Sequence, residues 1–124
     1  MKMALGARGE ANSRQLYEHR DPDYFNTRTV SVRPDGAVVF EGYDADKELE
    51  QFIGRDEWEG ELTVEARDVP KLRERLQLAF GPLPERRRSE REELLDLIEK
   101  GFGGRLNRMT QFEQWCREQG VEFT

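Results

Sequence analysis

The segment EWEGELTVEAR, residues 57–67, alternates between two kinds of side chain over its whole length. Trp58, Leu62 and Val64 fall on one side, whereas the other side is mostly glutamate. Successive side chains of a β-strand point to opposite faces of a sheet, so the pattern predicts one long strand with a buried and a solvated face. The chain is therefore expected to contain a sheet that is apolar on one face only, which is typical of antiparallel sheets.

Three more segments carry strand patterns. Residues 27–32 are β-branched and alternate, residues 37–43 are mostly apolar, and the turn sequence RPDG lies between them. The Asp-Gly step of this turn supplies the positive φ that a tight hairpin needs. Residues 13–20 alternate more weakly, and residues 121–124 can close the chain as a short strand. The sequence thus predicts an antiparallel sheet of four to five strands.

Three helices are expected after the long strand, because apolar residues recur there every three or four positions. Asp68 can cap the first helix, and Gly81 with Pro82 ends it. Ser89 and Glu92 have the spacing of a capping box at the start of the second. The residues expected to face inward are Val69, Leu72, Leu76, Ala79 and Phe80, then Leu94, Leu95 and Ile98, and finally Leu106, Met109, Phe112, Trp115 and Cys116.

A shorter helix is expected over residues 44–54. Leu49 and Phe52 have helical spacing there, Asp44 is placed to cap the helix, and Gly54 is placed to stop it. The pattern covers only about two turns of helix.

Residues 1–13 lack any period and are expected to form a flexible tail. Residues 14–124 are expected to form a single α+β domain, an antiparallel sheet of four to five strands with about three helices packed on one face. A chain of 124 residues can bury one modest core. Only 35% of the residues are hydrophobic but 10% are aromatic, which indicates a core built on rings.

Several classes of site are excluded by composition. Cys116 and His19 are the only residues of their types, so the chain has no intrachain disulfide and no four-ligand zinc site. We expect no metal and no cofactor. No run approaches the roughly 20 apolar residues of a membrane span, and the N-terminus lacks the apolar core of a secretory signal. A cytoplasmic location and no membrane partner are therefore expected.

Four further motifs have ordinary explanations. Glu59 and Glu61 have the separation of glycosidase carboxylates, but neighbours on an exposed strand have no reason to differ in pKa. The segment that begins at Asp44 starts like a calcium loop and lacks its central glycine. The glycines of residues 101–108 follow no phosphate-loop pattern. The basic run ERRRSER, residues 85–91, is thin for a nucleic-acid site in an acidic chain, so we expect no nucleic-acid partner.

The charge is unevenly distributed along the chain. Residues 41–65 carry ten acidic and two basic side chains, a net of −8, whereas the whole chain has −6, so the remainder carries +2. Alternate residues of a strand lie about 6.6 Å apart, which is within a Debye length of about 8 Å. The glutamates of the long strand therefore repel one another.

Two interpretations of this acidic face are open. Charged strand faces are ordinary solvated surface and protect sheets from aggregation. Alternatively, aligned negative potential attracts and selects a basic partner. On the second interpretation, the partner-binding residues are Glu57, Glu59, Glu61 and Glu65, with Asp56 and Asp46. Trp58 belongs to the opposite face and is assigned to the core under the helices, although an exposed Trp58 would become a binding anchor.

Three separated segments resemble a family of small bacterial proteins of mostly unassigned function. They are DGAVVFEGYD, LTVEARDVPKL and FEQWCREQGVEF, and they cover most of residues 29–123. Members of this family are considered immunity-like because relatives occur near polymorphic toxins. The motifs are structural, so the resemblance implies no catalytic residue. Family members often continue past the last strand with aromatic residues, whereas this chain stops at Thr124.

The leading hypothesis is a noncatalytic binding protein of immunity or inhibitor type. Its acidic strand face would engage a basic protein partner such as a toxin domain. The alternative is a structural or assembly module that forms a homodimer and uses the acidic face for solubility. An enzyme built from Asp, Glu and Arg alone is a third class, for which we find no catalytic constellation.

Overall fold

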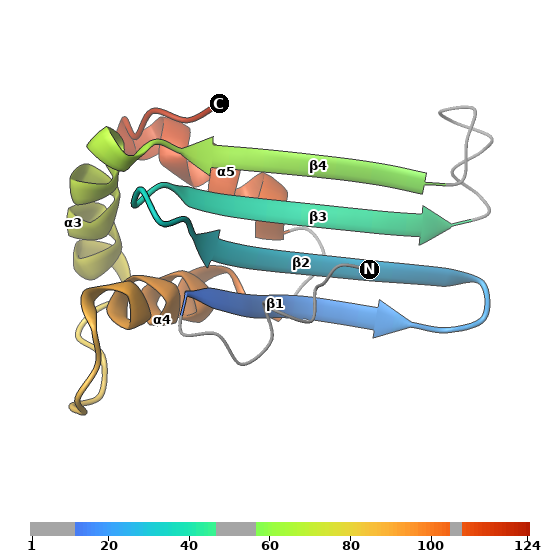
Figure 1. Cartoon of the computed structure of the whole chain (residues 1–124), viewed down its shortest axis with the longest axis horizontal. Coiled ribbons are helices and arrows are strands. Elements are labelled where there is room, and N and C mark those ends of the chain that lie inside the picture. Colours follow the sequence, from blue (N-terminus) through green and yellow to red (C-terminus); the bar gives the residue numbers. More distant parts are fainter. Residues whose placement is uncertain (1–11, 47–56, 105–107) are drawn as a thin grey trace.

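The computed structural model describes residues 12–46, 57–104 and 108–124. Its four strands pair antiparallel in chain order, so that each strand neighbours the next (Figure 1). The strands are β1 (Ser13–Arg20), β2 (Tyr24–Val32), β3 (Val38–Asp46) and β4 (Glu57–Val64). Most of the predicted tail, residues 1–11, lies outside the described residues.

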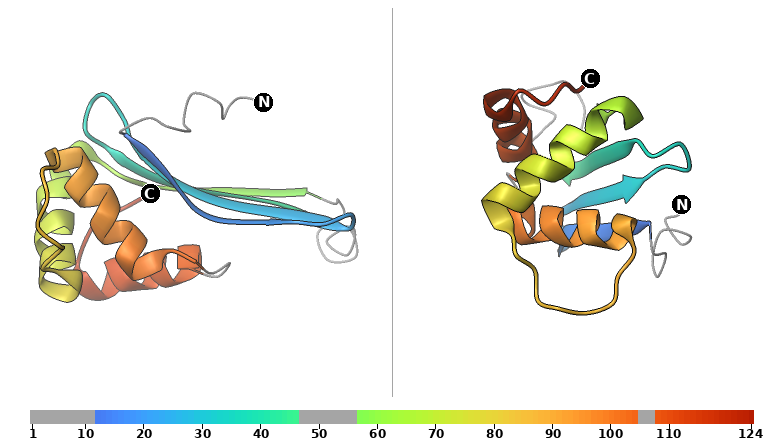
Figure 2. Two further views of the ribbon diagram at one scale, coloured as in Figure 1. Left: turned by 90° about the horizontal axis from the view of Figure 1, so that it is seen from below. Right: turned by 90° about the vertical axis from the view of Figure 1, so that its left-hand side faces the viewer.

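The helices lie on one face of the sheet and over one end of it, while the other half of the sheet projects beyond them (Figures 1 and 2). They are the single 3₁₀ turn η1 (Ala66–Asp68) and the α-helices α3 (Val69–Phe80), α4 (Glu90–Phe102) and α5 (Arg108–Gln119). The predicted α+β class is therefore confirmed, with four strands and three α-helices in the described part of the chain.

Local chemistry accounts for two of the predicted boundaries. Gly36 has a φ of +97°, and Asp35 Oδ1 accepts a hydrogen bond from the Ala37 N–H at 2.9 Å, which fixes the hairpin between β2 and β3. At the start of α4, Ser89 Oγ accepts from the Glu92 N–H, and the Glu92 carboxylate accepts from the Ser89 N–H. This capping box satisfies two helix-end groups that have no partner within the helix.

The core lies between the helices and the covered half of the sheet, and it is built on rings. Phe112 of α5 is fully buried, and its ring lies 5.0–6.3 Å from the rings of Phe40, Phe102 and Trp115. Aromatic side chains bury roughly 150–250 Å² each, so this cluster supplies much of the apolar burial. The predicted inward residue Leu106 lies outside the described residues.

An ion-pair cluster fastens β1 and the loop before α4 to α4 itself. Asp96 accepts from Arg14 at 2.7 Å and from Arg86 and Arg88 at 2.9 Å each, and Arg14 also donates to Glu99. Burial alone would raise the pKa of Asp96, but the hydrogen bonds and charges of Arg14 and Arg86 outweigh it and lower that pKa. The basic run before α4 therefore contributes Arg86 and Arg88 to a structural ion-pair cluster.

The structure corrects the prediction of a helix that starts at Asp44. This residue lies inside β3, which continues to Asp46, and the rest of the predicted helix lies outside the described residues. Asp44 and Asp46 extend the alternation of β3 with polar side chains. The end of β3 was therefore not recognised as strand, because its alternating positions change there from apolar to polar residues.

Three smaller predictions also need correction. Ala79 was expected to face inward but is exposed, and the Asp68 side chain makes no capping hydrogen bond although it stands at the N-cap of α3. Residues 121–124 do not form a regular strand. Instead, the N–H and C=O of Thr124 exchange hydrogen bonds of 2.9 Å with Thr63 at the outer edge of β4.

Candidate functional site

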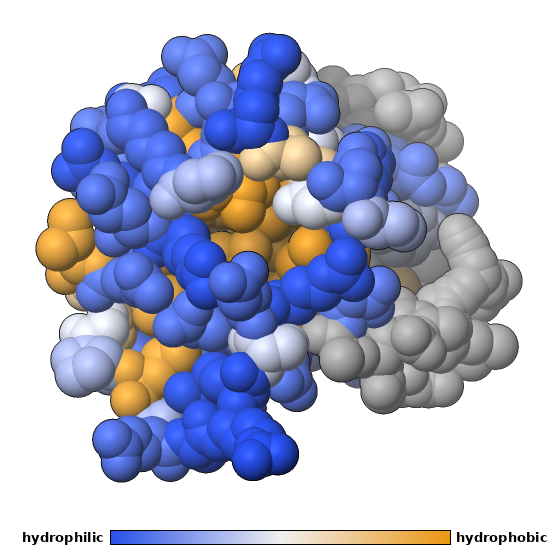
Figure 3. Space-filling view, turned by 60° about the vertical axis from the view of Figure 1, so that its left-hand side comes forward, coloured by the Kyte–Doolittle hydropathy of each residue, from blue (hydrophilic) through white to orange (hydrophobic). Residues whose placement is uncertain are grey.

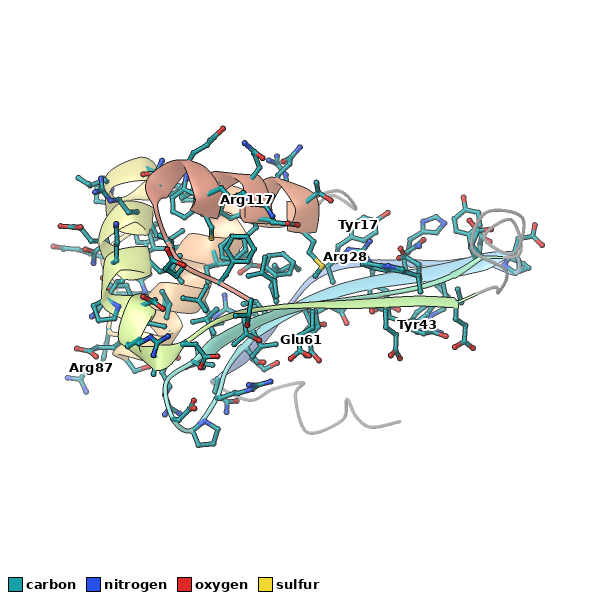
Figure 4. All side chains as sticks on the ribbon, turned by 90° about the horizontal axis from the view of Figure 1, so that it is seen from above. Tyr17, Arg28, Tyr43, Glu61, Arg87 and Arg117 are labelled. Atoms are coloured by element: carbon teal, nitrogen blue, oxygen red, sulfur yellow. The ribbon has the colours of Figure 1, made fainter. Side chains whose placement is uncertain are left out.

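The predicted acidic residues of β4 lie on the face of the sheet that no described helix covers. Glu57, Glu59 and Glu61 are all exposed. They pair across the sheet with Ala45, Tyr43 and Glu41 of β3, respectively. Figure 4 shows Glu61 and Tyr43 pointing away from the helices. This helix-free face therefore carries four glutamates on two adjacent strands, since Glu41 is also exposed.

These glutamates are largely uncompensated by the rest of the described chain. Arg33 of the β2–β3 hairpin donates to Glu61 at 2.9 Å, and both side chains are 49% exposed. Exposed pairs of this kind contribute only about 0–1 kcal/mol. Among the described residues, Glu41, Glu57 and Glu59 have no ion pair. The negative charge of β3 and β4 on this face is therefore largely not neutralised within the described residues.

Aromatic side chains lie beside the glutamates on the same face. The rings of Phe25 and Tyr43 are 6.1 Å apart, and the Arg20 guanidinium lies 4.3 Å from the Phe25 ring. Arg20 also pairs with Glu18. The face therefore has an acidic side, formed by β3 and β4, and a mixed side, formed by β1 and β2.

Two of the other predicted residues, Glu65 and Asp46, are not part of this group. Glu65 is exposed but follows the end of β4, next to η1. Asp46 pairs across the sheet with Tyr24 and belongs to the helix side, so it cannot join the glutamates. Asp56 lies outside the described residues. Glu41 was missed as a member, although its place in the alternating run VVFEGYD assigns it to the same face.

Trp58 was assigned to the core under the helices, and that assignment is wrong. It lies on the helix side of the sheet but in the projecting half, is only half-buried, and is not part of the core cluster. The indole lies across Gly60, because a Cβ built there would come within 2.5 Å of the ring. The strand alternation predicted the correct face, but it could not show that the helices end before Trp58.

A buried polar network occupies the projecting half on the same side. The Arg28 side chain is 7% exposed, and its Nη1 and Nη2 donate to Asp44 Oδ1 and Oδ2 at 2.9 and 3.2 Å. Nη1 also donates to the Thr27 carbonyl, and Asn26 Nδ2 donates to Asp44 Oδ1 at 2.8 Å. The Arg28 guanidinium lies 5.4 Å from the Trp58 ring centroid. Figure 4 shows Arg28 and Tyr17 on the helix side of the sheet.

This network was not predicted from the sequence, although one signal for it was present. Arg28 lies two and four residues before Val30 and Val32, so the alternation of β2 places a charged residue on the apolar face. A buried charge needs a partner. The partner is Asp44, sixteen positions away, and only the register of β2 against β3 identifies it.

The remaining reactive groups of the described residues are held in structural contacts. Burial raises the pKa of the Cys116 thiol to about 12, so it is a neutral thiol at pH 7. His19 Nε2 lies 2.9 Å from Asp21 Oδ2, and the His19 ring stacks on Tyr24. In the described ranges, no group of three or more His, Cys, Asp or Glu side chains is arranged to hold a metal ion. No described helix has the length and apolarity that a bilayer span requires.

The two faces of the projecting half therefore differ in what they offer a partner. One presents exposed carboxylates beside aromatic rings, and the other presents a buried guanidinium beside an indole. No protein-family model matches the chain, and comparisons with curated proteins and with solved structures give no match.

Proposed function

We propose that this protein is a noncatalytic binding domain of immunity or inhibitor type, whose helix-free face engages a basic protein partner such as a toxin domain. Glu57, Glu59 and Glu61 supply the charge, and Glu41 extends it onto β3. The proposal places the protein in the bacterial cytoplasm, in line with its resemblance to immunity-like proteins.

The observation that carries the proposal is the cross-strand pairing of Glu41 with Glu61. Like charges directly opposite each other destabilise a sheet, and an uncharged polar residue at either position would avoid that cost. In the part of the chain that the structure describes, only the exposed Arg33 offsets the repulsion. A basic side chain from a partner would replace Arg33 and remove the repulsion at the same time.

Tyr43 is the central contact that we propose for this face. It lies in the same cross-strand row as Glu59, one row from the Glu41–Glu61 pair, and its ring contacts Phe25. Tyrosine is enriched among the residues that dominate binding energy, and such residues are usually surrounded by polar groups. The glutamates would then speed association and select the partner, while the ring would contribute to affinity.

The test is a charge reversal with a matched control. The variant Glu59→Lys/Glu61→Lys reverses two charges on the helix-free face, and Glu74→Lys/Glu85→Lys reverses two exposed charges far from it. Tagged copies of all three proteins are used to recover partners from the native host. The affinity of each recovered, purified basic protein is then measured by calorimetry at two salt concentrations.

We expect the sheet-face variant to bind at least tenfold more weakly at low salt, because interfacial charge pairs contribute more than about 1.4 kcal/mol together. The control variant should bind like the wild type. Equal binding by all three proteins, with an unchanged salt dependence, would rule out the face as the docking surface.

Light scattering separates this proposal from the homodimer alternative. A monomer that binds a basic partner supports the proposal. A dimer that dissociates when Tyr43 is replaced by alanine would instead assign the face to self-association.

A further inference from the structure

The helix side of the projecting half is assembled from two adjacent cross-strand rows. One row runs Tyr17, Arg28, Gly42 and Gly60 from β1 to β4, and the next runs His19, Asn26, Asp44 and Trp58. Apart from the two glycines, every member of these rows is polar or aromatic. Figure 4 shows two members of these rows, Tyr17 and Arg28, beyond the N-terminal end of α5. The rows therefore need an explanation other than packing against a helix.

The hydrogen bonding of Arg28 is incomplete on one side. Asp44 takes one N–H from each terminal nitrogen of the guanidinium, and the Thr27 carbonyl takes another. Nε is buried, and among the described residues neither Nε nor the second hydrogen of Nη2 has an acceptor. These two N–H groups lie side by side and form the fork that binds a planar carboxylate with two parallel hydrogen bonds. A buried donor without an acceptor is uncommon in native proteins and is costly.

The sheet beside Arg28 has a glycine over which the guanidinium lies. A Cβ at Gly42 would lie 3.1 Å from the Cδ, Nε and Nη1 atoms of Arg28, so the guanidinium lies across a residue that has no side chain. Trp58 lies across Gly60 in the same manner. Because Gly42 and Gly60 are cross-strand partners, the two large side chains meet over adjacent bare positions of the sheet.

Positive potential reaches this side of the sheet from a second source. Helix α5 begins over the middle of the sheet, and its N-terminal end faces the projecting half (Figures 2 and 4). Its first turn contains no acidic residue, and its first residue is Arg108, whose Nε is also buried and has no partner among the described residues. The N-terminus of a helix carries a partial positive charge that favours an anion.

The negative groups nearby restrict which anion would be accepted. Asp44 is engaged by Arg28 and Asn26, and Asp46 is the next residue of β3 on the same face. Two carboxylates disfavour a doubly charged phosphate more than a singly charged carboxylate. The Trp58 ring lies beside the guanidinium, and Tyr17 is the cross-strand partner of Arg28 on the same face. Nearby rings suit a ligand whose charged group is attached to an aromatic or apolar body.

We propose that this side of the sheet binds a monocarboxylate carried on an aromatic or apolar body, through the Nε–H and the second Nη2–H of Arg28, with Trp58 as the flanking contact. The ligand is either a free organic acid or the C-terminal residue of a peptide, since both present the same chemistry. Trp58 moves to admit it, because its ring lies against the guanidinium and outside the core. This site is separate from the acidic face and lies on the opposite side of the sheet.

The experiment is a titration of the full ¹⁵N-labelled chain, followed through the Arg28 Nε–H and Trp58 indole N–H resonances. The probes are N-acetylphenylalanine, its amide, which has the same body without the carboxylate, and acetate, which has the carboxylate without the body. The peptide Ala-Ala-Ala-Phe, with a free or an amidated C-terminus, distinguishes the two sources. The Trp115 indole, packed in the core, serves as an internal control.

We expect N-acetylphenylalanine to shift both resonances, with a dissociation constant on the order of 1 mM for a ligand of this size. Its amide and acetate should each bind at least tenfold more weakly, and Trp115 should not respond. Tighter binding of the free-acid peptide than of N-acetylphenylalanine identifies a peptide C-terminus, and the reverse order identifies a free acid. The proposal is overturned if the Arg28 Nε–H exchanges with water and its resonance does not respond to the acid. It is also overturned if the resonance responds equally to acid and amide.

The variant Arg28→Lys keeps the charge opposite Asp44 but removes the fork, so it should abolish the response of the Trp58 indole to the acid. Arg33→Lys on the hairpin is the matched control. If Arg28→Lys does not fold, Trp58→Leu takes its place. This variant should bind N-acetylphenylalanine severalfold more weakly, while its binding of acetate should be unchanged. Unchanged binding of N-acetylphenylalanine to the folded variant would contradict the proposal.

Discussion

The covered and projecting halves of the sheet use the same strands for different purposes. On the helix side, β2 contributes Val30 and Val32 to the covered half, both almost fully buried, whereas it contributes Arg28 and Asn26 to the projecting half. β3 changes in the same way, from Phe40 to Asp44. Apolar residues stabilise a core without the desolvation penalty that buried ion pairs carry. The covered half therefore accounts for the stability of the fold, and the projecting half is available for function.

The largest effect is expected from removing a ring in the covered half. Phe112→Ala should lower the free energy of unfolding by about 3–5 kcal/mol, because the side chain is fully buried among three other rings. Urea denaturation measures this loss. Leu78→Ala is the control: Leu78 is 73% exposed, so its loss should be within about 0.5 kcal/mol of zero. Equal losses at the two positions would mean that the core lies elsewhere.

In the projecting half, removing one partner of the Arg28–Asp44 pair should cost more than removing both. Asp44→Ala should lower the free energy of unfolding by about 2–4 kcal/mol, because it leaves a buried guanidinium uncompensated. The double variant Arg28→Met/Asp44→Leu should come within about 1 kcal/mol of the wild type, since an apolar pair of similar volume often replaces a buried ion pair. A double variant as unstable as Asp44→Ala would show instead that the network stabilises the fold.

The ion-pair cluster at the covered end should respond to acid. The pKa of Asp96 is lowered from 3.8 in the folded state, so its stabilising contribution is fully present above the unfolded pKa and is lost as the pH falls through the folded one. Asp96→Asn should cost about 2 kcal/mol at pH 7, and the difference from the wild type should shrink below about pH 4. Urea denaturation at several pH values measures it. A difference that did not depend on pH would mean that Asp96 acts by shape and not by charge.

The smallest effect on stability is expected on the helix-free face. Glu41→Lys should raise the free energy of unfolding by about 0.3–0.5 kcal/mol, because it converts a like-charge cross-strand pair into an attractive one. The same variant should also weaken the binding of the basic partner that we propose for the acidic face. A loss of stability would mean that Glu41 makes a contact that the fold requires.

Local patterns were sufficient to predict most of the covered half. The alternation of β2 and β4, the Asp-Gly turn and the Ser89–Glu92 capping box each depend on neighbours within a few residues. The apolar stripe of α4 was also predicted, because its buried residues follow the helical period. Short-range rules suffice where an apolar layer and its polar counterface alternate regularly.

The projecting half could not be predicted in this way. Asp44 was taken for a helix cap because nothing in its own segment reveals a guanidinium on the neighbouring strand. Trp58 was placed in the core because alternation gives the face of a side chain but not where the covering helices stop. Both errors concern distances between elements, which depend on register and on the relative lengths of sheet and helices.

The facing glycines of β3 and β4 constrain the order in which this sequence can change during evolution. A side chain at Gly60 collides with the Trp58 ring, and one at Gly42 presses on Arg28. Substitution at Gly60 is therefore deleterious until Trp58 has first been shortened, whereas substitution at Gly42 requires Arg28 to shift by a few tenths of an ångström. Lineages that retain the tryptophan should retain Gly60, and lineages that lose it become free to lose the glycine beneath it.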